Sequence, residues 1–220
     1  MILRQLQDLI ADIYDVRITH DVYDFLVTDR GELPAAARSN NTDEQLIVAQ
    51  PTENNGDEVG VSLYLDPALL ARLQRADPMS SLHDGNVADC WTALEGVSHF
   101  LYLAWNAGHD KPVSLLELEM QAEVDKYVAS YWLLRRQYPE RFPAELLRLL
   151  FERTRIDPSL AQGREDLYRQ ASRYAERFCR KLQQSLRGTR AAADREVLAE
   201  LRRFYRLTNA SKVAHIERTA

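Results

Sequence analysis

Four ionisable side chains stand at helical spacing in two neighbouring, largely apolar segments. Glu95 and His99 are four residues apart, and Glu119 and Glu123 repeat that spacing after a short turn. A spacing of four places both members of a pair on one face of a helix. Carboxylate oxygens and an imidazole nitrogen can together bind a divalent metal, or act as an acid and a base. The candidate catalytic residues are Glu95, His99, Glu119 and Glu123, and the candidate metal ligands are His99, Glu119 and Glu123.

Two long helices are expected to position these side chains. Apolar residues recur at helical spacing over residues 86–106, and a second such segment covers residues 114–137. The short turn between them predicts an antiparallel hairpin. Because both helices rise equally per residue, the register places Glu95 beside Lys126 and His99 close to Glu123.

A structural interpretation of the same residues is favoured over a site, because buried ion pairs in helical hairpins are commonly structural. Each side chain then has a local role: Glu117 in a capping box with Ser114, Glu119 at the helix dipole, Glu95 with Lys126, and His99 with Glu123. Gly96 inside the first helix predicts the close approach of another element, and a neighbouring helix is the simplest one.

Arginines form a stripe in the last third of the chain. They recur at spacings of four, four and three on one expected helix, and more follow on the next. The planar guanidinium of arginine suits carboxylates and phosphates. Interspersed acidic residues and an isoelectric point near 5.6 are unlike a dedicated nucleic-acid-binding module. The candidate anion-binding or partner-binding residues are Arg169, Arg173, Arg177, Arg180, Arg202 and Arg206.

Charge is divided unevenly along the chain. Residues 1–130 hold 8 Lys and Arg against 22 Asp and Glu, whereas residues 131–220 hold 20 against 11. Such polarity indicates either attraction between the two halves within the fold or an anionic partner for the basic half. The sequence leaves both alternatives open.

The first 78 residues predict a small α/β element. An amphipathic helix covers residues 3–13, and a short helix begins at Pro67 with Asp66 as its N-cap. Between them, three antiparallel strands are expected at residues 22–27, 45–50 and 59–65, with a hairpin loop at residues 51–58.

Residues 79–220 predict a bundle of four to five long helices. After the hairpin described above, helices are expected at residues 143–153, 165–187 and 190–207, and after residue 209. The predicted fold class is therefore α+β and mostly α, with a three-stranded antiparallel element and flanking helices in residues 1–78 and a helical domain in residues 79–220.

Signatures of common cofactor sites are absent from the sequence. The eight glycines are dispersed, so no phosphate-binding glycine loop is present. Cys90 and Cys179 lie among apolar residues, as reduced and buried thiols do. No apolar run has the length of a membrane span or the form of an export signal. We expect a cytoplasmic protein without a cofactor and without membrane association.

These observations favour a non-catalytic protein-interaction or regulatory function, with a protein partner or self-association through the charge-polarised surface. The first alternative is a metal-dependent or acid–base enzyme that uses the Glu and His residues, with a divalent metal as its cofactor. The second alternative is nucleic-acid binding through the arginine stripe.

Overall fold

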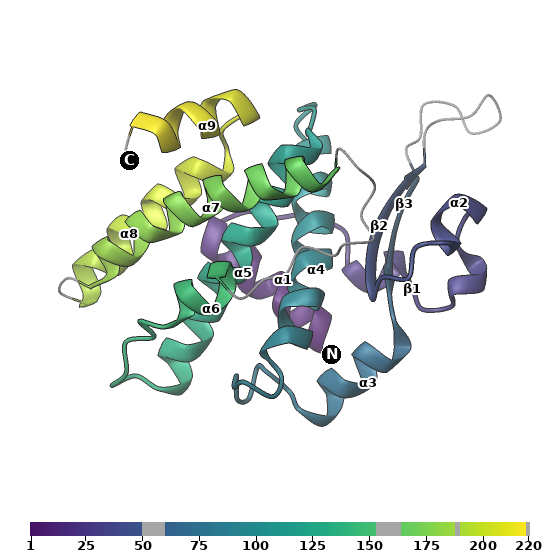
Figure 1. The fold of residues 1–220 in the computed structure, drawn as a ribbon, viewed down its shortest axis with the longest axis horizontal. Helices are drawn as coiled ribbons and strands as arrows, with labels where there is room; N and C mark the ends of the chain where they lie inside the picture. The colour runs from purple at the N-terminus through teal and green to yellow at the C-terminus, as the bar shows by residue number, and fades with distance from the viewer. Residues whose placement is uncertain (50–59, 153–163, 188–189, 219–220) are drawn as a thin grey trace.

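The computed structural model describes residues 1–49, 60–152, 164–187 and 190–218. A helical hairpin formed by α4 (Val87–Ala107) and α5 (Leu115–Gln137) lies at the centre of the molecule. A small sheet lies on one side of this hairpin, and the C-terminal helices lie on the other (Figure 1). The predicted fold class, α+β and mostly α, is confirmed.

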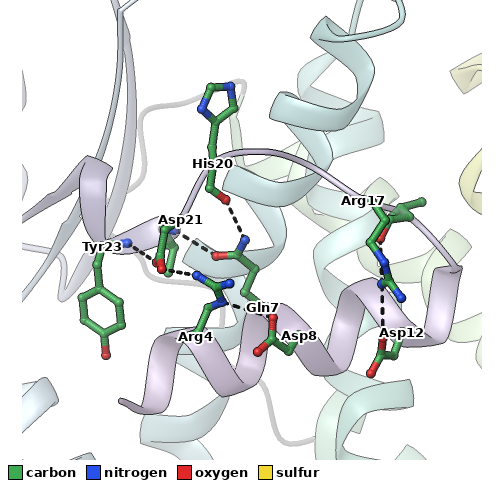
Figure 2. Close-up of polar contacts among 10 residues, drawn as sticks. Arg4, Gln7, Asp8, Asp12, Arg17, His20, Asp21 and Tyr23 are labelled. Atoms are coloured by element: carbon green, nitrogen blue, oxygen red, sulfur yellow. Dashed lines mark hydrogen bonds and ion pairs between the residues drawn. The ribbon is translucent and has the colours of Figure 1, made fainter.

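The first helix, α1 (Ile2–Tyr14), buries the apolar stripe that its sequence predicted and ends at Asp15, which has a positive φ of 51°. The chain then turns back along the helix (Figure 2). Gln7 donates to the His20 carbonyl and accepts from the Val22 amide, both at 2.9 Å. These two hydrogen bonds fasten the returning segment to α1.

The sheet is mixed, with strand order β1-β3-β2. As expected, β2 (Glu44–Ala49) pairs with β3 (Gly60–Leu65) in the antiparallel direction. The first strand, β1 (Leu26–Val27), is parallel to β3, so the expectation of a purely antiparallel element was wrong. The hairpin loop expected at residues 51–58 lies outside the described residues.

The first strand is also much shorter than expected. Val22–Phe25 form a 3-10 turn, η1, because the Asp21 side chain accepts from the Tyr23 amide and caps the turn. Two further short elements were not predicted: η2 (Arg30–Glu32) and α2 (Ala35–Arg38). The helix α3 (Pro67–Arg75) begins as expected, with the Asp66 side chain accepting from the Ala68 amide at 2.8 Å.

The hairpin predicted from the sequence is confirmed, including the start of α5. Ser114 Oγ accepts from the Glu117 amide at 3.2 Å. The Glu117 carboxylate instead accepts from the Tyr102 hydroxyl, so the reciprocal half of the predicted capping box was wrong. The hydroxyl of Tyr102 on α4 is therefore the donor to Glu117, in place of the Ser114 backbone amide that a capping box would use.

Four more helices complete the described part of the chain: α6 (Leu146–Glu152), α7 (Arg164–Leu186), α8 (Arg190–Tyr205) and α9 (Asn209–Arg218). The helix α7 packs along α5, while α1 contacts both α4 and α8 (Figure 1). One continuous hydrophobic core reaches from Ile2 to Ile216 and includes side chains from both sides of residue 78. The predicted division at that residue stays a prediction. Within the described ranges, no helix is both long enough and apolar enough to cross a membrane.

Candidate metal centre

Buried and half-buried polar side chains lie along both edges of the α4–α5 hairpin. Successive residues of a helix are turned by about 100°, so α5 can present one polar set to the sheet and another to the opposite side. The edge that faces the sheet, here called the His99 cluster, holds Glu44, Glu95, His99, Glu119, Glu123 and Lys126. The other edge, here called the Asp125 cluster, holds Tyr14, Ser98, Gln121, Asp125 and Lys212.

His99 lies between two carboxylates that come from different elements. Its Nδ1 is 3.6 Å from Glu44 Oε1 of β2, and its Nε2 is 3.6 Å from Glu119 Oε2 of α5. The histidine side chain is only 5% exposed. Both separations are slightly longer than a hydrogen bond, and His99 Nε2 has no hydrogen-bond partner among the described residues.

The two carboxylates control the protonation of the imidazole. Burial by itself would lower the pKa of His99, but Glu119 and Glu44 outweigh that effect and hold the pKa well above its ordinary value. For Glu44, burial raises the pKa, and the nearby His99 only partly reverses this change. Without a bound metal, the imidazole therefore carries a proton that its carboxylate neighbours stabilise.

Lys126 forms a second centre of charge within the His99 cluster. Its Nζ is 2.7 Å from Glu95 Oε2 and 2.8 Å from Glu123 Oε1. Burial would lower the pKa of Lys126, but Glu123 and Glu95 raise it above its ordinary range. The predicted ion pair between Glu95 and Lys126 is confirmed. The expected contact between His99 and Glu123 is not formed, because Glu123 pairs with the lysine.

Gly96 creates the space through which Glu44 reaches His99. A Cβ atom at residue 96 would lie 2.8 Å from Leu63 Cδ1 and 3.0 Å from Glu44 Cγ. Both distances are shorter than ordinary van der Waals contact, so a side chain there would displace the sheet or the glutamate. The element that approaches Gly96 is the sheet, and the expectation of a neighbouring helix was wrong.

Three members of the His99 cluster have a geometry that suits a metal ion. One ligand atom each from Glu95, His99 and Glu119 lie within 4.8 Å of one another. Zinc lies 2.0–2.2 Å from nitrogen and oxygen ligands, so neighbouring ligands of a tetrahedral zinc are about 3.4 Å apart. The distance of 3.6 Å between His99 Nε2 and Glu119 Oε2 is close to this ligand–ligand distance. Glu44 then occupies the position of the carboxylate that accepts from the second ring nitrogen of a metal-bound histidine.

The structure brings the four candidate site residues of the sequence into one cluster but divides their roles. Glu95, His99 and Glu119 converge, whereas Glu123 lies beside Lys126. Glu44 was missed, because it belongs to a strand 55 residues before His99. The one sequence signal that could have indicated its approach is Gly96, and that glycine does not reveal which element comes close.

A cleft in the described part of the chain lies elsewhere on the hairpin. It has a volume of about 810 Å³ and lies where the start of α4, the end of α5 and α6 meet. Its lining includes Leu82, Val87, Leu134, Tyr138 and Leu146. No residue of the His99 cluster lines it, so the candidate metal centre and the cleft are separate features.

The candidate arginines fall into two groups. Those of α7, which are Arg169, Arg173, Arg177 and Arg180, are all exposed. The other two bind backbone at the C-terminal end of α1: Arg202 of α8 donates to the Ile13 carbonyl, and Arg206, which directly follows α8, donates to the carbonyls of Tyr14 and Asp15. These two guanidinium groups stabilise the helix end, where the backbone carbonyls lack partners.

The Asp125 cluster is a hydrogen-bonded network around one buried carboxylate. Asp125 accepts from the hydroxyls of Tyr14 and Ser98 and from the amide of Gln121. Burial raises the pKa of Asp125 to about 6, even though these three donors act in the opposite direction. Sequence reasoning did not identify this cluster, since its members come from α1, α4, α5 and α9.

Comparison with protein-family models, with curated proteins and with solved structures finds no match for this chain.

Proposed function

We propose that this protein binds a divalent metal ion through Glu95, His99 and Glu119, with zinc, manganese and iron as the metals that suit one nitrogen and two oxygen ligands. The observation that carries the proposal is the buried Nε2 of His99, which lacks a hydrogen-bond partner and faces Glu119 at 3.6 Å. A buried nitrogen without a partner is costly, and a metal ion supplies one.

Charge within the cluster supports the same proposal. The His99 cluster contains four glutamates, and Lys126 is its single permanent cation. The proton on His99 offsets part of the remaining negative charge, and a divalent cation would replace that proton and offset more. Three protein ligands leave a coordination position for water or substrate, which is the arrangement of catalytic zinc centres. The Glu95 side chain is 29% exposed, so solvent reaches this end of the cluster.

The test is a thermal unfolding experiment on chelator-treated protein, with and without added zinc, manganese or iron(II). A ligand that binds only the native state at 100 times its Kd stabilises it by about 2.7 kcal/mol. For a chain of this size, that corresponds to a rise in Tm of roughly 5–10 °C. Calorimetric titration of the same samples should give a stoichiometry near one.

Two isosteric variants on α5 provide the comparison. Glu119→Gln removes a proposed ligand and should abolish the rise in Tm, whereas Glu123→Gln removes a carboxylate one turn away and should retain it. Equal loss in both variants would indicate attraction to the negative charge of the cluster without defined ligands. No response of the parent protein to any of the three metals would rule out the proposal.

A second candidate function is the protein-interaction role that the sequence favoured. It is supported by the pattern of ion pairs: among the described side chains, each pair joins two residues within the acidic part, 1–130, or two within the basic part, 131–220. On α7, Arg169 and Arg180 pair with glutamates of their own helix. Arg173 and Arg177 are exposed and have no ion pair with any described residue. This face can therefore meet an anionic partner.

The interaction proposal predicts retention on an anionic matrix that falls as salt concentration rises. Changing both Arg173 and Arg177 to Gln should lower the salt concentration needed for elution, while Arg203→Gln on α8 should lower it less. Self-association is tested by sedimentation velocity of the same proteins. Binding to nucleic acid with a stronger salt dependence than binding to heparin would favour the nucleic-acid alternative.

A further inference from the structure

The C-terminal helix α9 inserts a lysine into the centre of the molecule. Lys212 is fully buried, with 0% exposure. Its Nζ donates to Gln121 Oε1 of α5 and lies over three aromatic rings, with centroid distances of 4.5 Å to Tyr102, 4.7 Å to Phe204 and 5.9 Å to Tyr205. No carboxylate lies within ion-pair distance of this nitrogen among the described residues. The amine is therefore bound mainly by a neutral amide and by ring faces.

The two nearest carboxylates already have other donors. Glu117 accepts from the Tyr102 hydroxyl, and Asp125 accepts from three side chains of its own cluster. A desolvated contact with a ring face favours a charged amine by about 2 kcal/mol or more, whereas burying an unpaired ammonium ion in a medium of low dielectric constant costs on the order of tens of kcal/mol. The site accordingly suits an uncharged amine better than a charged one.

We propose that α9 is a latch, which closes against α5 and α8 when Lys212 enters as an uncharged amine and is released more readily when that amine is protonated. Release would uncover Tyr102, Phe204 and Tyr205, which are buried in the closed form. The inference is independent of the proposed metal centre, because the two clusters lie on opposite edges of the hairpin.

The lowered pKa of the buried Lys212 amine supports the proposal that protonation favours release of α9. Burial lowers the pKa of Lys212 to about 7, and the more distant Glu117 and Asp125 offset only part of that shift. A lysine on a released helix would have its ordinary pKa of about 10.4. Closing the latch therefore releases a proton between pH 7 and pH 10, and the closed form gains stability as pH rises through that range.

Other titratable groups lie around Lys212. Burial raises the pKa of Asp125 to about 6, so its titration is nearly complete at pH 7. Burial also keeps the pKa values of the neighbouring tyrosines above their ordinary range of about 10. Glu200 of α8, whose pKa is lowered although burial opposes the shift, pairs with His215 of α9. Glu117 and Asp125 of α5 act electrostatically on Lys212, and the rings of Tyr102 of α4 and Tyr205 of α8 lie beside its amine. Further out, Tyr14 of α1 and Cys179 of α7 interact with Asp125.

Hydrogen exchange of the α9 amides measures the latch directly. Protection factors, corrected for intrinsic exchange rates, should rise by about 50-fold between pH 7 and pH 9, given pKa values of about 7 when closed and about 10.4 when open. The protection factors of the α5 amides should change much less over the same pH range. If α9 and α5 gain protection together, α9 opens only when the whole protein unfolds, and the latch is overturned.

A matched pair of lysine variants identifies the group responsible. Lys212→Met keeps the length of the side chain but cannot be protonated, so its α9 protection should be nearly independent of pH. Lys111→Met removes a lysine that also lies over an aromatic ring, 5.1 Å from the Trp105 centroid, but that is not buried, and it should behave like the parent. Equal pH dependence in Lys212→Met and the parent would overturn the proposal.

A readout on the parent protein alone keeps the test valid if Lys212→Met does not fold. The chain has four lysines, so the side-chain ¹³Cε resonance of each can be followed through a titration. The Lys212 resonance should titrate near pH 7. A midpoint near its ordinary value of about 10.4 would show that the buried amine stays charged and would overturn the latch.

Discussion

Glu95 of α4 and Lys126 of α5 form an ion pair across the hairpin, with 2.7 Å between Glu95 Oε2 and Lys126 Nζ. Lys126 also pairs with Glu123, three residues earlier on its own helix. Because the lysine side chain is only 8% exposed, water cannot readily replace it as a partner. Two partly buried carboxylates thus depend on a single cation.

Replacing Lys126 by methionine should lower the free energy of unfolding by about 3 kcal/mol, because two carboxylates are left without their cation. The double variant Glu95→Gln with Lys126→Met should be less destabilised than Lys126→Met alone, since one of those charges is then removed. Urea denaturation at pH 7 gives both differences. A Lys126→Met protein as stable as the parent contradicts this prediction.

Replacing Gly96 by alanine should destabilise the protein by roughly 1 kcal/mol. Alanine is favoured over glycine in a helix by about 0.8–1 kcal/mol, but overpacking against the sheet costs about 1–3 kcal/mol. Gly108→Ala is the control, since a Cβ there meets only ordinary contacts at 3.5 Å and 3.6 Å. Thermal unfolding should show a lower Tm for the first variant and an unchanged or higher Tm for the second. The reverse order would mean that Glu44 and Leu63 move aside easily.

Asp125 should make stability depend on pH in the acid range. Burial raises its pKa from 3.8 to about 6, so the folded state favours the neutral carboxyl. This contribution to stability is complete below about pH 4 and is lost as pH rises through about 6. Between pH 4 and pH 7, the stability of the parent relative to Asp125→Asn should fall by up to about 3 kcal/mol. Denaturant titrations across this range measure it, and Asp84→Asn, at an exposed carboxylate, should show no such trend.

Arg206 should stabilise the end of α1. Its guanidinium donates to the Tyr14 carbonyl at 3.0 Å and to the Asp15 carbonyl at 2.9 Å. Arg206→Ala should lower the free energy of unfolding by about 1 kcal/mol, because two charge-assisted hydrogen bonds to a helix C-terminus are lost. Arg203→Ala, at an exposed position in the last turn of α8, should change it by less than about 0.5 kcal/mol. Equal effects of the two variants in chemical denaturation would show that the contacts to α1 do not contribute.

Local rules were enough to predict the hairpin and one of its ion pairs. The rise of an α-helix is constant, so a short turn fixes which residues of two antiparallel helices meet, and Glu95 therefore lies beside Lys126. The caps at Asp66 and Ser114 were also predictable, because each cap is a hydrogen bond between residues only two or three positions apart.

Contacts set by tertiary packing were not predictable. Glu44 reaches His99 only because the sheet packs against Gly96, and Lys212 reaches Gln121 from 91 residues away. At η1, the β-branched and aromatic residues indicated a strand, but the Asp21 side chain binds the backbone and stabilises a turn. Helical periodicity predicts which face of a helix is buried, but it does not predict which other element packs against that face and covers a carboxylate there.

The position of α1 has a consequence for how the chain folds as it is synthesised. Tyr14, near the end of that helix, stacks on Tyr205 of α8 with 4.2 Å between ring centroids. Tyr205 follows Tyr14 by 191 residues, so α1 finds this packing partner only after α8 has been made. We expect the face of α1 that packs on α8 to remain exposed to chaperones and proteases until then, and a chain that stops before α8 to be degraded rapidly.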